Sequence, residues 1–129
     1  MNEKELIEEY DELFELYNTD DNSIIARYGI ECMSGWYSII NRLCFQIRHY
    51  VKQNEIESPK IAQIKQKFGG MRFYICGGND DYIRGMIRMA ESMSFNICEK
   101  CGNYKEAGED CSSYCEKCRE ENKNKWKRT

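Results

Sequence analysis

The sequence predicts an α+β fold, in which helices pack on a small antiparallel β-hairpin or sheet and a four-cysteine module follows. Three observations predict it. Apolar residues recur at three- and four-residue steps in three segments, and they alternate with a period of two on both sides of Gly69-Gly70. After Ser94 the composition changes to a cysteine-rich stretch. We therefore expect an α+β body over residues 1–94 and a smaller module with a basic tail over residues 95–129.

Three amphipathic helices are expected in the body, over residues 3–17, 34–53 and 80–93. The first carries acidic residues opposite its apolar stripe. The second begins at Ser34, a good N-cap, and has Trp36 on its buried side. The third begins near Asp80 and Asp81. Because a helix N-terminus stabilises adjacent carboxylates, we interpret this pair as a cap rather than as catalytic acids.

A β-hairpin is expected over residues 60–76, with Gly69 and Gly70 as its two-residue loop. This loop would pair Phe68 with Met71 and Lys67 with Arg72. The pairing sorts the side chains into a core face and an opposite face. The core face would hold Ile64, Gln66, Phe68, Met71, Phe73 and Ile75, and the opposite face Lys65, Lys67, Arg72 and Tyr74.

The basic residues of the second face have two interpretations. Lys67 directly opposite Arg72 would destabilise a sheet unless negative charge lies nearby. The face is either solvated or neutralised by the acidic first helix, or by Glu55 and Glu57. Alternatively it is an anion site, in which the cations hold a phosphate and Tyr74 stacks on a base or sugar. Two residues of the third helix, Arg84 and Arg88, would be ordinary solvated surface or would extend that site.

Two C-x-x-C pairs predict a metal site. They are Cys98 with Cys101 and Cys115 with Cys118, and four thiolates satisfy a tetrahedral zinc ion. We expect a structural Zn²⁺ in a zinc-ribbon-like module, because four protein ligands leave no position for a reacting water. The alternatives are a redox dithiol, an iron centre or unligated cysteines, and Cys111 could replace one ligand in poorer geometry.

The other cysteines, Cys32, Cys44 and Cys76, are expected to be small buried apolar residues. His49 has no serine or cysteine beside it in the sequence that would suggest a nucleophile and base pair. The basic tail over residues 123–128, which includes Trp126, is expected to be a frayed, solvated end.

The charge distribution and the hydropathy of the chain indicate its expected partner and compartment. The chain has 129 residues and a net charge of −3, but residues 1–22 carry −8 and the remainder carries +5. A basic body raises the chance of an anionic partner. The sequence shows neither a membrane-spanning run nor the start of a signal peptide, so we expect the chain in the cytosol. In that reducing compartment spaced cysteines favour metal over disulfides.

Several strings resemble a group of small uncharacterised proteins encoded by bacteriophages and prophages. They are Gly35-Trp36-Tyr37, Leu43-Cys44, IKQKFGGMRFY, GGNDDYIRGMIRMAESMS and ICEKCG, and the resemblance covers about residues 27–118. The group's four metal positions match Cys98, Cys101, Cys115 and Cys118. The resemblance implies a phage origin and a cytosolic location in the host bacterium. It implies no activity, although small phage proteins are often inhibitors of host defence.

Together these features predict a non-enzymatic binding protein of phage origin that counteracts host defence. It would bind or sequester an anionic small molecule such as a nucleotide signal, or bind a host protein, and it would not bind a membrane; an oligomer is compatible with the sequence. The alternative is a zinc-ribbon adaptor that binds nucleic acid or the host transcription machinery through the module and tail. An enzyme that hydrolyses a phosphorylated ligand with Asp80 or Asp81 is the third hypothesis.

Overall fold

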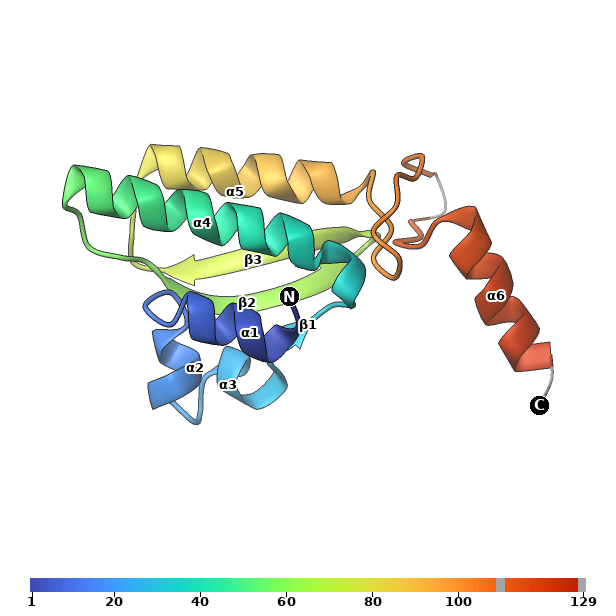
Figure 1. The fold of residues 1–129 in the computed structure, drawn as a ribbon, viewed down its shortest axis with the longest axis horizontal. Coiled ribbons are helices and arrows are strands. Elements are labelled where there is room, and N and C mark those ends of the chain that lie inside the picture. Colours follow the sequence, from blue (N-terminus) through green and yellow to red (C-terminus); the bar gives the residue numbers. More distant parts are fainter. Residues whose placement is uncertain (109–110, 128–129) are drawn as a thin grey trace.

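The computed structural model describes residues 1–108 and 111–127, with side chains as far as residue 123, and it confirms an α+β fold. The body begins with three short helices, α1 (Glu3–Glu9), α2 (Glu15–Thr19) and α3 (Ile24–Tyr28). The remaining elements are β1 (Ile30–Glu31), the 3₁₀ turn η1 (Ser34–Trp36), α4 (Tyr37–Asn54), β2 (Lys60–Lys67), β3 (Gly70–Cys76), α5 (Asp81–Ser94) and α6 (Glu116–Lys127). Figure 1 shows α4 and α5 side by side along the sheet and α6 projecting away from the body.

The sheet has the strand order β1-β2-β3. The antiparallel pairing of β2 with β3 agrees with the expected hairpin, whereas the parallel pairing of β1 with β2 was not predicted. A strand of two residues is too short to show a period. One face of the sheet enters the core through Ile64, Met71 and Phe73. On the opposite face Lys65, Lys67, Arg72 and Tyr74 are partly or fully exposed, so this face is open to solvent. Gln66, which was predicted on the core face, is exposed.

The turn of the hairpin lies one residue earlier than the sequence predicted. Lys67 pairs with Gly70 and Lys65 pairs with Arg72, so the loop is Phe68-Gly69, with φ angles of 53° and 85°. The predicted Gly69-Gly70 loop and the Lys67–Arg72 pair are therefore wrong. Phe68 is also not a core residue, because its side chain is 69% exposed.

Contacts with the cysteine module explain this register. A Cβ on Gly70 would lie 2.4 Å from the Phe95 ring, and one on Gly69 would lie 2.7 Å from the carbonyl oxygen of Cys111. Both glycines thus serve close packing, while Phe68 takes up a left-handed conformation at a cost of about 1 kcal/mol. The shift moves each cross-strand partner by two residues, so the predicted division of the strand residues between the two faces is unchanged.

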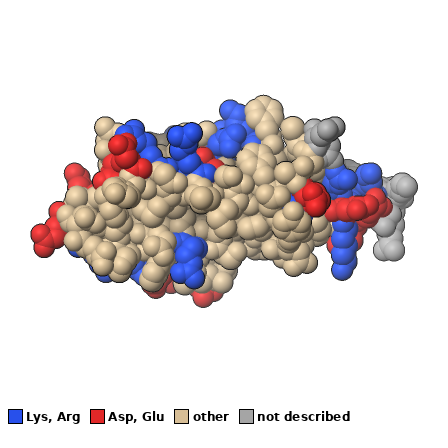
Figure 2. All heavy atoms as spheres, turned by 90° about the horizontal axis from the view of Figure 1, so that it is seen from above, with Lys and Arg blue, Asp and Glu red and all other residues tan. Residues whose placement is uncertain are grey.

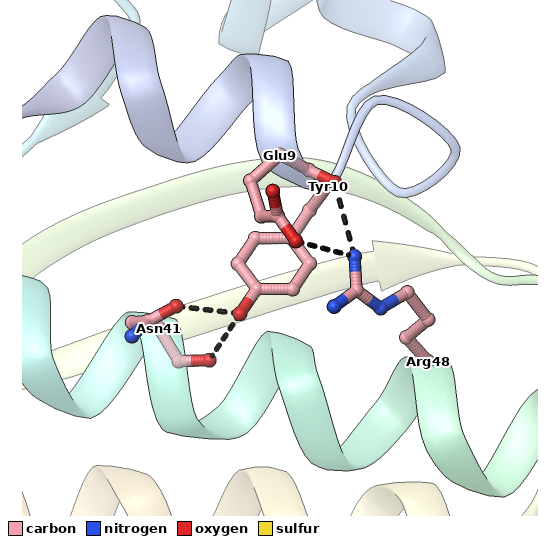
Figure 3. Close-up of polar contacts among 4 residues, drawn as sticks. All are labelled: Glu9, Tyr10, Asn41 and Arg48. Carbon is pink, nitrogen blue, oxygen red and sulfur yellow. Dashed lines mark hydrogen bonds and ion pairs between the residues drawn. The ribbon is translucent and has the colours of Figure 1, made fainter. Parts of the chain in front are cut away.

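The expected single helix over residues 3–17 is wrong, because α1 ends at Glu9 and α2 begins at Glu15. The segment between them turns so that the carbonyl of Leu13 accepts a 2.8 Å hydrogen bond from the amide of Ile61 on β2. Tyr10, where the turn begins, is buried and donates its hydroxyl to Asn41 of α4 (Figure 3). A continuous helix would leave the Ile61 amide without this partner.

An arginine of α4 makes a second contact with the N-terminal segment, at Tyr10 and Glu9. Arg48 lies with its guanidinium carbon 4.6 Å from the centre of the Tyr10 ring. It donates hydrogen bonds to the carbonyl and the carboxylate of Glu9, at 3.1 and 3.0 Å (Figure 3). The acidic N-terminal segment is therefore fixed to α4 at the end of α1, where the helix carbonyls favour a cation.

The outer edge of β3 is covered by two side chains of α5. The Ser94 hydroxyl accepts a 2.8 Å hydrogen bond from the Met71 amide, and the Glu91 carboxylate accepts a 2.9 Å bond from the Phe73 amide. These amides belong to alternate residues of an edge strand, which would otherwise be available for pairing with another chain. The helix begins as predicted, with Asp80 as its N-cap.

The expected frayed tail is wrong for the backbone as far as Lys127, which continues α6. The side chain of Trp126 and the whole of Arg128 lie outside the described residues. In the cysteine module, an isolated bridge joins Ile97 to Tyr104. No helix in the described ranges is long and apolar enough to cross a membrane.

Replacing Ser94 by alanine should lower the free energy of unfolding by about 1–3 kcal/mol, because the buried Met71 amide would lose its acceptor. Urea denaturation measures the change. Ser92→Ala is the matched control, since Ser92 is an exposed serine on the same helix. Equal effects of the two substitutions would contradict the assigned role of Ser94.

Candidate functional site

The four cysteines of the two C-x-x-C pairs lie together. Cys98 and Cys101 follow α5, Cys115 immediately precedes α6, and Cys118 lies in the first turn of that helix. Their sulfur atoms all lie within 4.8 Å of one another, and the Cys101 and Cys115 sulfurs are 3.8 Å apart. This arrangement can bind a metal ion. Cys111 is not part of the group, so it is not needed as a fifth candidate ligand.

Backbone amides point at the sulfur atoms of the first pair. The amide of Cys101 lies 3.5 Å from the Cys98 sulfur, and the amide of Asn103 lies 3.5 Å from the Cys101 sulfur. Burial raises the pKa of Cys98, but backbone hydrogen bonds from Cys101, Cys115 and Lys100 outweigh it and lower that pKa to about 6. One ligand is thus favoured as a thiolate.

The pKa of the fourth cysteine, Cys118, is shifted in the opposite direction from that of Cys98. Burial, followed by its hydrogen-bonded cysteine neighbours, raises the pKa of Cys118 to about 12. A second thiolate beside the first is unfavourable without a cation, because both would be negative at close range. The donor set therefore fits a metal ion, whose charge would stabilise all four thiolates.

The first cysteine pair is attached to the body through Glu99. This side chain is 6% exposed, and its two carboxylate oxygens accept hydrogen bonds from the Met33 amide at 2.9 Å and the Ser113 hydroxyl at 2.6 Å. Its backbone amide also donates to the carbonyl of Ser113. One residue thus joins the body, the first pair and the segment that leads to the second pair.

Gly35 and Trp36 form the body side of this contact. The Gly35 amide donates to the carbonyl of Glu99 at 2.7 Å, and the Trp36 indole donates to the carbonyl of Ile97 at 2.7 Å. A Cβ on Gly35 would lie 2.2 Å from the carbonyl oxygen of Cys98. Glycine is needed here because two backbones pass at a distance that excludes any side chain.

The sequence did not identify Glu99 as a site residue. Both C-x-x-C pairs contain the same Glu-Lys dipeptide, yet Glu99 is buried and the equivalent Glu116 is exposed. The sequence signal that could have pointed to this contact is Gly35-Trp36. A glycine next to a tryptophan that is expected to be buried indicates that another backbone packs closely there.

The remaining cysteines have different environments. Cys44 is buried in the core as predicted, and burial raises its pKa. Cys32 is partly buried, and burial raises its pKa to about 12. Cys76 is exposed, so its predicted burial is wrong; it ends β3, where the strand leaves the core.

The second candidate site is the open face of the sheet, which carries Lys65, Lys67, Arg72 and Tyr74. We call these four residues the basic sheet face. Lys65 and Arg72 are cross-strand partners, so two cations lie directly opposite each other. The ring of Tyr74 is 42% exposed, and the Lys65 ammonium nitrogen lies 6.0 Å from its centre.

The acidic N-terminal segment forms no ion pair with this face. Glu9 pairs with Arg48 and Glu15 pairs with Lys60. Glu31 of β1 is the partner of Lys65 in the sheet, and its carboxylate accepts a 3.1 Å hydrogen bond from Gln63. Within the described part of the chain, no carboxylate forms an ion pair with Lys65, Lys67 or Arg72.

Arg84 and Arg88 lie on the β3 side of α5. They share a helix face with Glu91, which reaches the Phe73 amide at the edge of β3. Arg84 forms a 2.8 Å ion pair with Asp81, so its charge is already partly balanced. Figure 2 shows several Lys and Arg side chains along the upper border of the view, with acidic side chains among them at the left, beside a broad uncharged surface.

The two acids at the start of α5 have structural partners. Asp80 accepts hydrogen bonds from the amides of Tyr82 and Ile83 and from the Tyr50 hydroxyl. This agrees with the interpretation of Asp80 as a helix cap.

No known protein family, curated protein or solved structure matches this chain. The candidate sites are therefore interpreted from their own geometry.

The cysteine cluster should hold one metal ion per chain, and Cys98→Ser should lose it. Elemental analysis of the purified protein measures the metal content, and circular dichroism reports the accompanying loss of structure, because such a site contributes on the order of 10 kcal/mol to folding. Cys111→Ser is the matched control and should keep the metal. Full metal content in Cys98→Ser would contradict the site.

Gly35→Ala should lower the free energy of unfolding by roughly 3 kcal/mol, because the added Cβ would meet backbone atoms that cannot move aside. Gly85→Ala, at a helix position where an added Cβ meets open space, should instead raise it by about 0.5–1 kcal/mol. Urea titration of the metal-loaded proteins compares them. An unchanged stability of Gly35→Ala would show that the two backbones are not held this closely.

Proposed function

We propose that this protein is a non-enzymatic binding protein in which a structural zinc ion holds the C-terminal module on the body. Zinc–sulfur bonds of about 2.3 Å in a tetrahedron place the sulfurs about 3.8 Å apart. The 3.8 Å between Cys101 and Cys115 supports an ion of this size. Four thiolates complete the coordination of zinc, so the ion would stabilise a zinc-ribbon-like module without taking part in chemistry.

The ligand that we propose is an anion carrying phosphate, bound on the basic sheet face. The observation that supports it is the partly exposed cross-strand pair of Lys65 and Arg72, for which the described side chains provide no ion pair to an acid. Adjacent like charges destabilise a sheet, and a bound phosphate would remove this cost. An arginine fork and a lysine ammonium are the groups that bind phosphate oxygens most strongly.

Tyr74 favours a nucleotide over a bare phosphate. Its exposed ring lies diagonally across the strands from Lys65 and on the same strand as Arg72. A base stacked on this ring would place its phosphate near both cations. A nucleotide ligand would therefore use every residue of this cluster.

The setting that we propose joins this ligand to the phage origin that the resemblance implies. In it, the protein lies in the cytosol and counteracts host defence by sequestering a nucleotide signal. Binding without turnover is consistent with the contacts of the two acids at the start of α5. Asp80 caps the helix, and Asp81 forms an ion pair with Arg84. A host protein as the target is the other form of this proposal.

Calorimetric titration with cyclic, linear and NAD-derived nucleotides tests the ligand. We expect at least one nucleotide to bind the metal-loaded protein, and Arg72→Ala to weaken that binding at least tenfold through loss of a charged hydrogen bond. Arg42→Ala is the control, because Arg42 is an exposed arginine of α4 away from the sheet. No heat across the whole set, or equal affinities of the two variants, would exclude the basic sheet face as the nucleotide site.

A further inference from the structure

Phe68 has a conformation and an exposure that folding does not require. It occupies the first position of the hairpin loop with φ 53°, where asparagine or glycine would be less strained. Its ring is 69% exposed, so it contributes little to the core. Exposed aromatic rings in strained loops are typical of binding sites.

The Phe68 ring continues the basic sheet face. The Lys67 ammonium nitrogen lies 5.7 Å from the centre of the Phe68 ring, as the Lys65 nitrogen lies 6.0 Å from that of Tyr74. Lys65 and Lys67 alternate along β2 on the open face, with Arg72 opposite Lys65. Lys67 and the Lys65–Arg72 pair therefore form a row of cations that has an exposed aromatic ring at each end.

The length of this row identifies the ligand class. Tyr74 lies four positions after Gly70, the first strand residue after the loop, which corresponds to about 13 Å along β3. A mononucleotide has one base and can stack on one ring at a time. A strand of several nucleotides has a base for each ring and a phosphate for each cation between them.

We propose that the basic sheet face together with Phe68 binds single-stranded nucleic acid, with bases stacked on Tyr74 and Phe68 and the intervening phosphates bound by Lys65, Lys67 and Arg72. This inference rests on the proposed binding of nucleotides by the same face. An open sheet that presents aromatic rings suits unpaired bases, whose faces are accessible, better than a duplex, in which the bases are stacked on one another.

Glu31 limits the site on the side of β1. Glu31 is the register partner of Lys65 in the sheet, and its carboxylate, which accepts a hydrogen bond from Gln63, would repel a phosphate on that side. The nucleic acid backbone would therefore follow the β2–β3 side of the face, from Tyr74 toward the hairpin loop.

Fluorescence anisotropy tests the proposal with the full metal-loaded chain. The probes are labelled oligothymidylates and oligouridylates of two, four, six and eight nucleotides, a labelled mononucleotide, and a hairpin duplex. We expect affinity to rise with length and then level off, with the duplex binding more weakly. The slope of log affinity against log salt should be about −2 for three phosphate contacts, and Lys67→Ala should reduce its magnitude by about 0.7.

Phe68→Asn separates the two proposals. Asparagine tolerates the left-handed conformation, so the fold should be unchanged or more stable, while oligonucleotide affinity should fall about tenfold. Mononucleotide affinity should not change. Phe68→Trp should restore oligonucleotide binding, and Tyr28→Ala, which removes an exposed ring on α3, is the matched control.

The outcomes are distinct. Affinity that is independent of length, tighter binding of the duplex, or unchanged oligonucleotide binding by Phe68→Asn would overturn the single-strand proposal while leaving nucleotide binding in place. Failure of every nucleotide and oligonucleotide to bind would overturn both proposals. A difference between the thymidylate and uridylate series would identify DNA or RNA as the preferred ligand, since only RNA offers the 2′-hydroxyl.

Discussion

The close approach of two backbones at Gly35 is the contact on which the arrangement of the molecule depends. Gly35 donates its amide to Glu99, and the buried Glu99 carboxylate accepts from Met33 and Ser113. Since Glu99 adjoins Cys98, a metal ion at the cysteine cluster would fix the same backbone that the body binds. The buried carboxylate also has a hydrogen-bond partner for each oxygen, which offsets part of the cost of burying a polar group.

The hairpin loop of the body also packs against the cysteine module. Gly69 lies against Cys111 and Gly70 lies under the Phe95 ring, so the loop is positioned by the segments that flank the first cysteine pair. Packing against the module leaves Phe68 outside the core and turned to solvent. The cysteine cluster and the exposed residues of the proposed ligand site are therefore connected through the sheet.

The two faces of the sheet have separate roles. Ile64, Met71 and Phe73 are buried, and α5 covers the open edge of β3 through Glu91 and Ser94. These contacts stabilise the sheet from one face and one edge, so the basic residues of the other face are not needed for packing. Their charges remain without acidic partners among the described side chains, which is the state that an anionic ligand would stabilise.

The sequence by itself determined the features that follow from local spacing: the α+β class, the helices near α4 and α5, the Asp80 cap, the four clustered cysteines and, apart from Gln66 and Phe68, the side chains on each face of the hairpin. Only the tertiary structure decided the break between α1 and α2, the loop at Phe68-Gly69 and the burial of Glu99 rather than Glu116. Each of these depends on a partner distant in the chain: Ile61 for Leu13, Phe95 for Gly70, and Met33 for Glu99. Periodicity and spacing describe neighbours along the chain, and they contain no information about such distant contacts.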